Sequence, residues 1–224
     1  MSRRCGVCDS EIDTDKCKTL QAKCIFTKTD IIRYICPCCD VIFGPLYLID
    51  MSFPDLMETY NQLYKTYDEG ANTDGEVEIA KQIFKSNDGV YLDFGCGRWS
   101  TSIGMLRANG YNVFGYEPCI EATGGNGKYV INLEKMKTMM FDGIYSFNVL
   151  EHLQHPIEDM KMLRNILKPG ARMIHSTPCY QYAYEYSRWH LYFFVGKSID
   201  FLCEKSGLEI ETRNPNIISF KVKT

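Results

Sequence analysis

The sequence predicts an α/β protein in two parts: a small cysteine-rich domain, followed by a larger body with a mostly parallel sheet and helices on both faces. Seven of the eleven cysteines precede residue 40. From Gly75 onward, short apolar runs alternate with amphipathic segments, which is typical of strands connected by helices. Because 45% of the 224 residues are hydrophobic and 24% are charged, the chain can bury one substantial core.

Composition narrows the class of partner. The chain has 25 Lys and Arg against 28 Asp and Glu, a net charge of −3, which gives no overall attraction to nucleic acid or to an anionic membrane. The first 40 residues, with seven basic and six acidic side chains, are scarcely basic. No apolar stretch has the length of a signal peptide or a membrane span. We expect a soluble, cytoplasmic protein without a membrane span. Nucleic acid is not an expected partner, and the oligomeric state is left open.

The cysteine-rich part, residues 1–50, is named the head. Its two tight turns, Cys5-Gly6-Val7-Cys8 and Cys36-Pro37-Cys38-Cys39, each place two thiolates three residues apart. Two such turns make a tetrahedral zinc site with Cys5, Cys8, Cys36 and Cys39 as ligands, which predicts a zinc ribbon with a structural, non-catalytic metal. We expect residues 31–35 to form a strand that leads into the second turn. Ordinary buried cysteines are the alternative, and Cys17, Cys24 and Cys38 leave the ligand set open.

Residues 51–74 are predicted to be a linker helix followed by a hinge. Apolar side chains recur at helical spacing over residues 52–67, with Ser52 as N-cap and Pro54 in the first turn. Tyr64 and Tyr67 on this helix are candidate substrate contacts, although packing is the simpler explanation for them. Residues 68–75 are polar and contain glycine, which is typical of a hinge or lid.

The body, residues 75–224, reads as a series of strands and helices. A first helix carries Val77, Ala80, Ile83 and Phe84 on one face. Further helices are expected from Ser100 or Thr101 to about residue 110, from Pro156 to Leu167, and over residues 198–207. Strands are expected over residues 90–94, 111–116, 129–133, 143–147 and 172–176, with a closing pair of strands over 208–213 and 217–222.

The turn after the first strand of the body points to a cofactor. The strand runs into Asp93-Phe94-Gly95-Cys96-Gly97, where the glycines allow a ligand to approach the backbone closely. Glu117 ends the next strand, 20 residues after Gly97, where a carboxylate can accept both hydroxyls of a ribose. A solvated charge at a strand end is the alternative for Glu117. Together these residues favour a cofactor of the adenosine type.

Four further motifs follow along the body: Phe141-Asp142-Gly143-Ile144, Asn148-Val149-Leu150-Glu151-His152-Leu153, Leu167-Lys168-Pro169-Gly170 and Ser176-Thr177-Pro178. With the glycine turn and Glu117, they make residues 75–224 resemble the class I S-adenosylmethionine-dependent methyltransferases, which implies a Rossmann-like sheet with an antiparallel closing strand. The head, the linker helix and the segment Trp189–Phe193 resemble a narrower group, zinc-ribbon methyltransferases similar to bacterial enzymes that methylate nucleotide sugars or surface polysaccharide.

The resemblance also implies which residues bind S-adenosylmethionine: Gly95 and Gly97 beneath the methionine portion, Asp93 beside its amino group, Glu117 on the ribose, Asn132 and Leu133 around the adenine, and Asn148 near the sulfonium. The sequence departs from the family pattern in three places, one of which is the glycine-rich stretch 124–127, which leaves little room for the usual helix between the second and third strands. Trp99 stands where many members have a third glycine, and Asn132 stands where an acidic residue is usual.

Methyl transfer to a sugar hydroxyl or to an acidic carbon needs a base near the methyl group. Glu151 and His152 follow the strand over residues 143–147, at the edge of the sheet where ligands bind, so we expect His152 to be the base and Glu151 its orienting partner. Helix capping or packing is the alternative for this pair. His190 is a candidate substrate contact.

The predicted function is O- or C-methylation of a small polar acceptor, most simply a nucleotide sugar or a surface-polysaccharide sugar. RNA methylation and a non-catalytic cofactor-binding module are the alternatives. The sequence does not identify the acceptor or the methylated atom.

Overall fold

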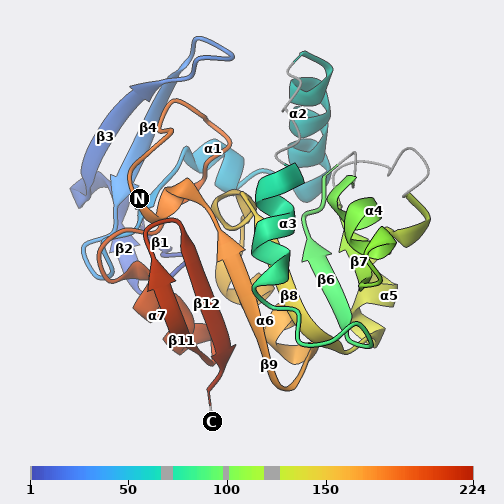
Figure 1. Cartoon of the computed structure of the whole chain (residues 1–224). Coiled ribbons are helices and arrows are strands. Elements are labelled where there is room, and N and C mark those ends of the chain that lie inside the picture. Colours follow the sequence, from blue (N-terminus) through green and yellow to red (C-terminus); the bar gives the residue numbers. More distant parts are fainter. Residues whose placement is uncertain (1, 67–72, 98–100, 119–126, 224) are drawn as a thin grey trace.

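A computed structural model describes residues 2–66, 73–97, 101–118 and 127–223. Tyr67 and Trp99 lie outside the described residues, as does the side chain of Tyr64. Within the described ranges the strands form a six-stranded sheet, a four-stranded sheet and a two-stranded ribbon (Figure 1). No described helix has both the length and the apolar character needed to cross a bilayer.

The head consists of short antiparallel strands joined by tight turns. Its elements are β1 (Ser2–Arg4), β2 (Glu11–Asp13), a 3₁₀ helix (Thr14–Lys16), β3 (Lys18–Lys23), β4 (Asp30–Ile35) and β5 (Ile42–Phe43). The strand predicted over residues 31–35 is confirmed as β4, which pairs with β3 from Lys18 opposite Ile35 to Lys23 opposite Asp30. Along β4 the buried Ile31 and Arg33 alternate with the exposed Ile32, so one face of this hairpin packs inward.

Two helices connect the head to the body. They are α1 (Leu46–Ile49) and α2 (Phe53–Thr66), and α2 confirms the helix predicted over residues 52–67. The Ser52 hydroxyl oxygen accepts a hydrogen bond of 3.4 Å from the backbone N–H of Asp55, as expected for an N-cap. The next helix, α3 (Thr73–Lys81), includes Thr73–Gly75, which the sequence assigned to the hinge.

The large sheet has the predicted Rossmann-like arrangement. Its strands are β6 (Val90–Phe94), β7 (Asn112–Tyr116), β8 (Phe141–Phe147), β9 (Leu167–Ser176), β11 (Leu208–Asn214) and β12 (Ile217–Val222), in the spatial order β11-β12-β9-β8-β6-β7. Neighbouring strands from β9 to β7 are parallel, whereas β12 is antiparallel to both β9 and β11. The mostly parallel sheet with an antiparallel closing strand is therefore confirmed.

The strand predicted over residues 129–133 is wrong. The chain there forms a 3₁₀ helix (Gly127–Tyr129), a single bridge between Gly115 and Val130, and then helix α5 (Leu133–Thr138). The Asn132 side chain accepts a hydrogen bond of 2.9 Å from the backbone N–H of Lys135. This N-cap begins a helix directly after the bridge, so local capping overrides the β-propensity of the apolar run.

Helix α6 (Pro156–Asn165) ends two residues before the predicted Leu167, and β9 begins at Leu167 rather than at Arg172. The early start of β9 follows from pairing between Leu167 and Phe141, the first residue of β8. Gly170 adopts a φ of +73° in the stretch where the register between β8 and β9 shifts. The Pro-Gly pair thus makes an irregularity within the strand, not a turn before it.

Successive side chains along each strand point to opposite faces of the sheet, and helices cover both faces. On one face, Tyr91, Val113 and Tyr145 pack with α3 and with α4 (Thr101–Ala108). On the other face, Leu92, Ile144 and Met173 pack with α5, α6 and α7 (Ser198–Ser206) (Figure 1). The helices on both faces that the sequence predicted are confirmed.

The head and the body share one apolar core. The four cysteines of the two head turns belong to the same buried cluster as Leu150 and Met160 of the body. A short strand of the body, β10 (Tyr192–Phe193), pairs with β5 and completes the four-stranded sheet of the head. Because Gly6 lies directly against the Tyr192 side chain, a β-carbon at position 6 would overlap its hydroxyl.

Candidate active site and cysteine cluster

A cavity of about 1150 Å³ opens at the carboxyl ends of β6, β7 and β8. It is larger than the roughly 300–1,000 Å³ typical of a site for one small molecule, so it can hold a cofactor together with an acceptor. Ligands of open α/β sheets bind at this edge. Residues predicted to bind the cofactor and to carry the chemistry both line the cavity.

The glycine turn and Glu117 form one end of the cavity. Gly95 has a φ of +80° and lies so close to the Val149 side chain that it has no room for a β-carbon. Gly97 has a φ of +66°, and among the described residues other than its chain neighbours no atom lies within 4 Å of the position of a β-carbon, so this side of the glycine is open to them. Its backbone N–H donates a hydrogen bond of 3.1 Å to Glu117. The turn and the carboxylate are thus held together, as binding of a ribose beside the glycine turn requires.

Asp93 lies beneath this turn, in the interior. Its side chain is 2% exposed and accepts a hydrogen bond of 3.4 Å from the Ser102 hydroxyl. Burial raises the pKa of Asp93 well above its ordinary value, and the nearby charge of Glu76 raises it further. A cation at the turn would offset both effects, because an opposite charge favours the ionised carboxylate.

The other residues predicted to bind the cofactor differ in where they lie. Leu133 and Asn148 line the cavity. Asn148 adopts a φ of +54°, a conformation that asparagine tolerates, and its backbone N–H donates a hydrogen bond of 2.8 Å to the carbonyl of Ser176. Asn132 is exposed, does not line the cavity, and uses its side-chain oxygen to cap α5.

His152 lies farther along the cavity, in the 3₁₀ helix Leu150–His152 that follows β8. Its Nδ1 atom is 2.9 Å from the carbonyl oxygen of Trp189 and 2.9 Å from the hydroxyl of Tyr60. Because a carbonyl only accepts hydrogen bonds, Nδ1 carries the proton, and in the neutral ring Nε2 keeps its lone pair. Burial lowers the pKa of His152 to about 4, which keeps the ring neutral at physiological pH.

Glu151 and His190 lie beside His152. A carboxylate oxygen of the fully buried Glu151 and one ring nitrogen from each histidine lie within 4.8 Å of one another. The two imidazole rings meet edge to face, with centroids 5.1 Å apart. His190 Nδ1 is 3.4 Å from the Cys179 sulfur, and burial lowers the pKa of His190 to about 2. The structure thus brings together both predicted catalytic residues and one predicted substrate contact.

The sequence reasoning missed three contributors to this end of the cavity. Tyr60 on α2 and the carbonyl of Trp189 bind His152, whereas the sequence singled out Tyr64 and Tyr67 of the predicted linker helix. Phe26, at the tip of the β3–β4 hairpin in the head, lines the cavity and packs edge to face on Trp189, with ring centroids 5.6 Å apart. These contacts join distant parts of the chain, and no local pattern indicates them.

The cavity is acidic. The described side chains that line it include one lysine, Lys137, and no arginine. Six carboxylates also line it: Glu76, Glu78, Glu117, Glu151, Glu158 and Asp159. Burial, with the neighbouring Glu158 charge, raises the pKa of Asp159 to about 7, so this group is partly protonated at neutral pH. A lining of this kind favours cationic or neutral ligands over polyanions.

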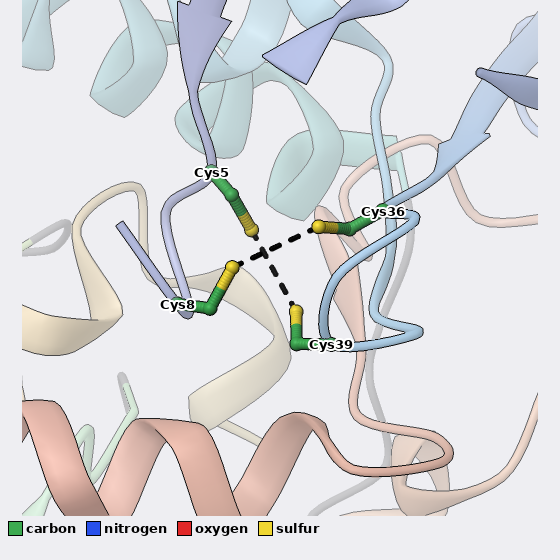
Figure 2. A group of neighbouring side chains, drawn as sticks. All are labelled: Cys5, Cys8, Cys36 and Cys39. Atoms are coloured by element: carbon green, nitrogen blue, oxygen red, sulfur yellow. Dashed lines mark hydrogen bonds between the residues drawn. The ribbon is translucent and has the colours of Figure 1, made fainter. Parts of the chain in front are cut away.

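The four predicted zinc ligands converge in the head (Figure 2). Cys5 and Cys36 begin turns of the same form, in which the cysteine N–H bonds the carbonyl five residues later. The sulfurs of Cys5 and Cys39, and those of Cys8 and Cys36, are each 3.8 Å apart. A tetrahedron with zinc–sulfur bonds of about 2.3 Å has edges of about 3.8 Å, so this set fits one zinc ion. Among the described cysteines, Cys17, Cys24 and the exposed Cys38 lie outside the set.

Comparison with known proteins agrees with this geometry. The sequence model of a family described as "Methyltransferase domain" matches residues 76–213. Among solved structures, the 1,6-didemethyltoxoflavin-N1-methyltransferase of Burkholderia thailandensis, with bound S-adenosylhomocysteine, superposes with a TM-score of 0.61. It is 13% identical, and the match covers 91% of this chain and 100% of that one.

The mitomycin 7-O-methyltransferase MmcR gives a TM-score of 0.51 at 18% identity, over 79% of this chain and 60% of that one. At such identities these likenesses concern the fold. The comparison with curated proteins found no match. The family model covers more than half of the chain, and the chain therefore belongs to the methyltransferase-domain family.

Proposed function

We propose that this methyltransferase binds S-adenosylmethionine between the glycine turn and Glu117, and methylates a small, sugar-like acceptor at the His152 end of the cavity. The observation that carries the proposal is the arrangement of one cavity, with the Gly97–Glu117 hydrogen bond at one end and the Glu151–His152–His190 cluster at the other. When bound, S-adenosylmethionine supplies a methyl group already activated by a positively charged sulfur.

The residues of the cofactor end have separable roles in this proposal. The open surface of Gly97 accepts the methionine portion, and Glu117 accepts the ribose hydroxyls. The buried carboxylate of Asp93 orients the amino group. Leu133 packs on the adenine, Asn132 contributes by capping the helix that begins at Leu133, and Asn148 lies near the sulfonium. The cationic charge of the cofactor suits the carboxylates in the lining.

At the acceptor end, His152 is proposed to be the base. Its Nδ1–H is held by the Trp189 carbonyl, so that Nε2 accepts a proton from a hydroxyl or from a carbon acid, and Glu151 stabilises the resulting imidazolium. His190 is proposed to contact the acceptor. Tyr64 and Tyr67 remain proposals as substrate contacts. Holding the acceptor in line with the methyl group supplies the remaining rate enhancement.

The acidic lining distinguishes between acceptors. It weighs against RNA, because a polyanion would meet several carboxylates and one lysine among the described lining residues. A nucleotide sugar is consistent with the lining when its sugar enters and its phosphates lie outside. Sugars without phosphate, and amino sugars above all, suit the lining best.

The test is a screen of nucleotide sugars, free sugars and amino sugars with S-adenosylmethionine that carries an isotopically labelled methyl group, read by mass. A labelled sugar product supports the proposal, and its formation should change little with salt, in contrast to methylation of RNA. His152→Gln should abolish most of the product. Labelled RNA without any labelled sugar would contradict the proposal.

We also propose that Cys5, Cys8, Cys36 and Cys39 bind a structural zinc ion. The closed set of four thiolates has no open coordination position for chemistry. The cytoplasmic location that we expect for the protein suits such a site, because thiols stay reduced there.

A further inference from the structure

Arg33, on strand β4 of the head, has a fully buried side chain. Its Nη1 atom donates a hydrogen bond of 2.7 Å to the carbonyl of Glu185, and its Nη2 atom donates bonds of 2.8 and 3.4 Å to the carbonyls of Ser187 and His190. The guanidinium also lies over the Phe193 ring, 4.8 Å from its centroid. Among the described residues, no carboxylate oxygen lies within ion-pair distance of it.

A buried arginine without a carboxylate partner is costly, and it persists where its donors satisfy several acceptors at once. Here Nη1 and Nη2 donate to three backbone carbonyls of one segment, residues 185–190, named the tether loop. The loop is more than 150 residues from Arg33 in sequence. The planar guanidinium can reach separate carbonyls along this loop, which the single ammonium of a lysine cannot do equally well.

The tether loop carries the carbonyl that holds His152. Two of the three carbonyls bound by Arg33, those of Ser187 and His190, lie on either side of Trp189, whose own carbonyl accepts the proton of His152 Nδ1. The side chain of Trp189 is held as well, by a 3.3 Å hydrogen bond from Nε1 to the Thr59 hydroxyl. Arg33 therefore binds the backbone on both sides of the Trp189 carbonyl.

We propose that Arg33 is a positioning residue for methyl transfer: by holding the tether loop, it keeps the Trp189 carbonyl on His152 Nδ1 and so leaves Nε2 as the atom that accepts the proton. The importance of this tautomer for catalysis rests on the proposed role of His152 as base. The head thereby serves the acceptor end of the cavity, whereas the glycine turn and Glu117 are built entirely by the body.

The tautomer can be measured without knowing the acceptor. The groups that face His152 are Tyr60 from α2, the adjacent Glu151, and His190 and the Trp189 carbonyl from the tether loop. In Arg33→Met the loop carbonyls lose their donors, the loop relaxes and Nδ1 loses its fixed acceptor. Both tautomers of His152 should then be populated.

The experiment is ¹⁵N NMR of the full-length, zinc-loaded protein with labelled histidine. The chain has four histidines, and His152→Gln assigns the signal of interest. The wild type should show a protonated Nδ1 and an unprotonated Nε2. Arg33→Met should show a mixture of the two tautomers, while its affinity for S-adenosylhomocysteine stays within about twofold because the cofactor end does not touch the loop.

Arg3→Met is the matched control, because Arg3 is another arginine of the head, pairs with Asp50 and makes no contact with the tether loop. It should leave the His152 signals unchanged. Arg33→Lys should give an intermediate mixture, and it decides the question if Arg33→Met fails to fold. An unchanged tautomer of His152 in a folded Arg33 variant would overturn the proposal. Retained methyl transfer in His152→Gln would instead refute the role of His152 as base and leave the NMR result standing.

Discussion

Replacing one cysteine of the Cys₄ set should remove the zinc and destabilise the whole protein. In Cys39→Ser a weak hydroxyl ligand stands where a thiolate completes the tetrahedron. A structural zinc contributes an apparent 10–16 kcal/mol, roughly, to the folding of a small domain at neutral pH. That exceeds or matches the total stability of about 5–15 kcal/mol of an ordinary protein. Because the four cysteines belong to the same buried core as Leu150 and Met160, we expect one unfolding transition at a lower temperature, without a separate transition of the head.

Cys38→Ser is the matched control, since Cys38 is the exposed neighbour of Cys39 and lies outside the cluster. Metal content is measured by elemental mass spectrometry and stability by calorimetric unfolding, with and without a chelator. The wild type and Cys38→Ser should each contain one zinc per chain, and Cys39→Ser should contain little. The reasoning fails if Cys39→Ser keeps its zinc, or if metal-free wild type unfolds at the same temperature as the zinc-loaded protein.

Three further predictions concern the cavity. Glu117→Gln should weaken binding of S-adenosylhomocysteine about 10- to 100-fold in calorimetry, because a charge-assisted hydrogen bond contributes about 1.5–3 kcal/mol. The control is Glu134→Gln, which changes an exposed residue of α5 and should bind as tightly as the wild type. Because the folded state raises the pKa of Asp93, its charge opposes folding at pH 8 and this effect disappears as the pH falls and the group takes up a proton. Asp93→Asn should therefore unfold at a higher temperature than the wild type at pH 8, and the difference should shrink toward pH 4. The variant should also bind S-adenosylhomocysteine more weakly. An equal or lower unfolding temperature of Asp93→Asn at pH 8 would contradict this explanation. His152→Gln should lower turnover of the identified acceptor by about 10²–10⁴ with unchanged cofactor affinity, and undiminished turnover in steady-state kinetics would exclude His152 as the base.

The parts of the structure that sequence alone could predict are those with local signals. The turn at Gly95 and Gly97 is marked by residues that tolerate positive φ, and the spacing of the paired cysteines marks the cluster in the head. The position of Glu117 followed from the order of strand, helix and strand. In each case the residues that determine the structure lie within a few positions of one another or at the ends of consecutive strands.

The errors arose where two local signals compete. The apolar run from Tyr129 to Ile131 favours a strand, but Asn132 caps a helix directly after it, and the sheet gains a single bridge. The end of α6 shifted because Leu167 pairs with Phe141, a residue 26 positions away. Propensity alone does not decide such cases, because the outcome depends on a partner strand elsewhere in the chain.

The surroundings of His152 lay beyond sequence reasoning for a different reason. The pair Glu151-His152 could be recognised, but Tyr60 lies 92 residues before His152, and Trp189 lies 37 residues after it. Arg33 reaches the tether loop across an even longer separation. Such pairings appear once the fold brings the head, α2 and the loop to one side of the cavity, and they determine the tautomer of the proposed base.

Titration of the purified protein with S-adenosylhomocysteine in a calorimeter tests the central claim most directly. We predict binding of one molecule per chain at the Gly97–Glu117 end of the cavity. The absence of any binding to folded, zinc-loaded protein would contradict the account.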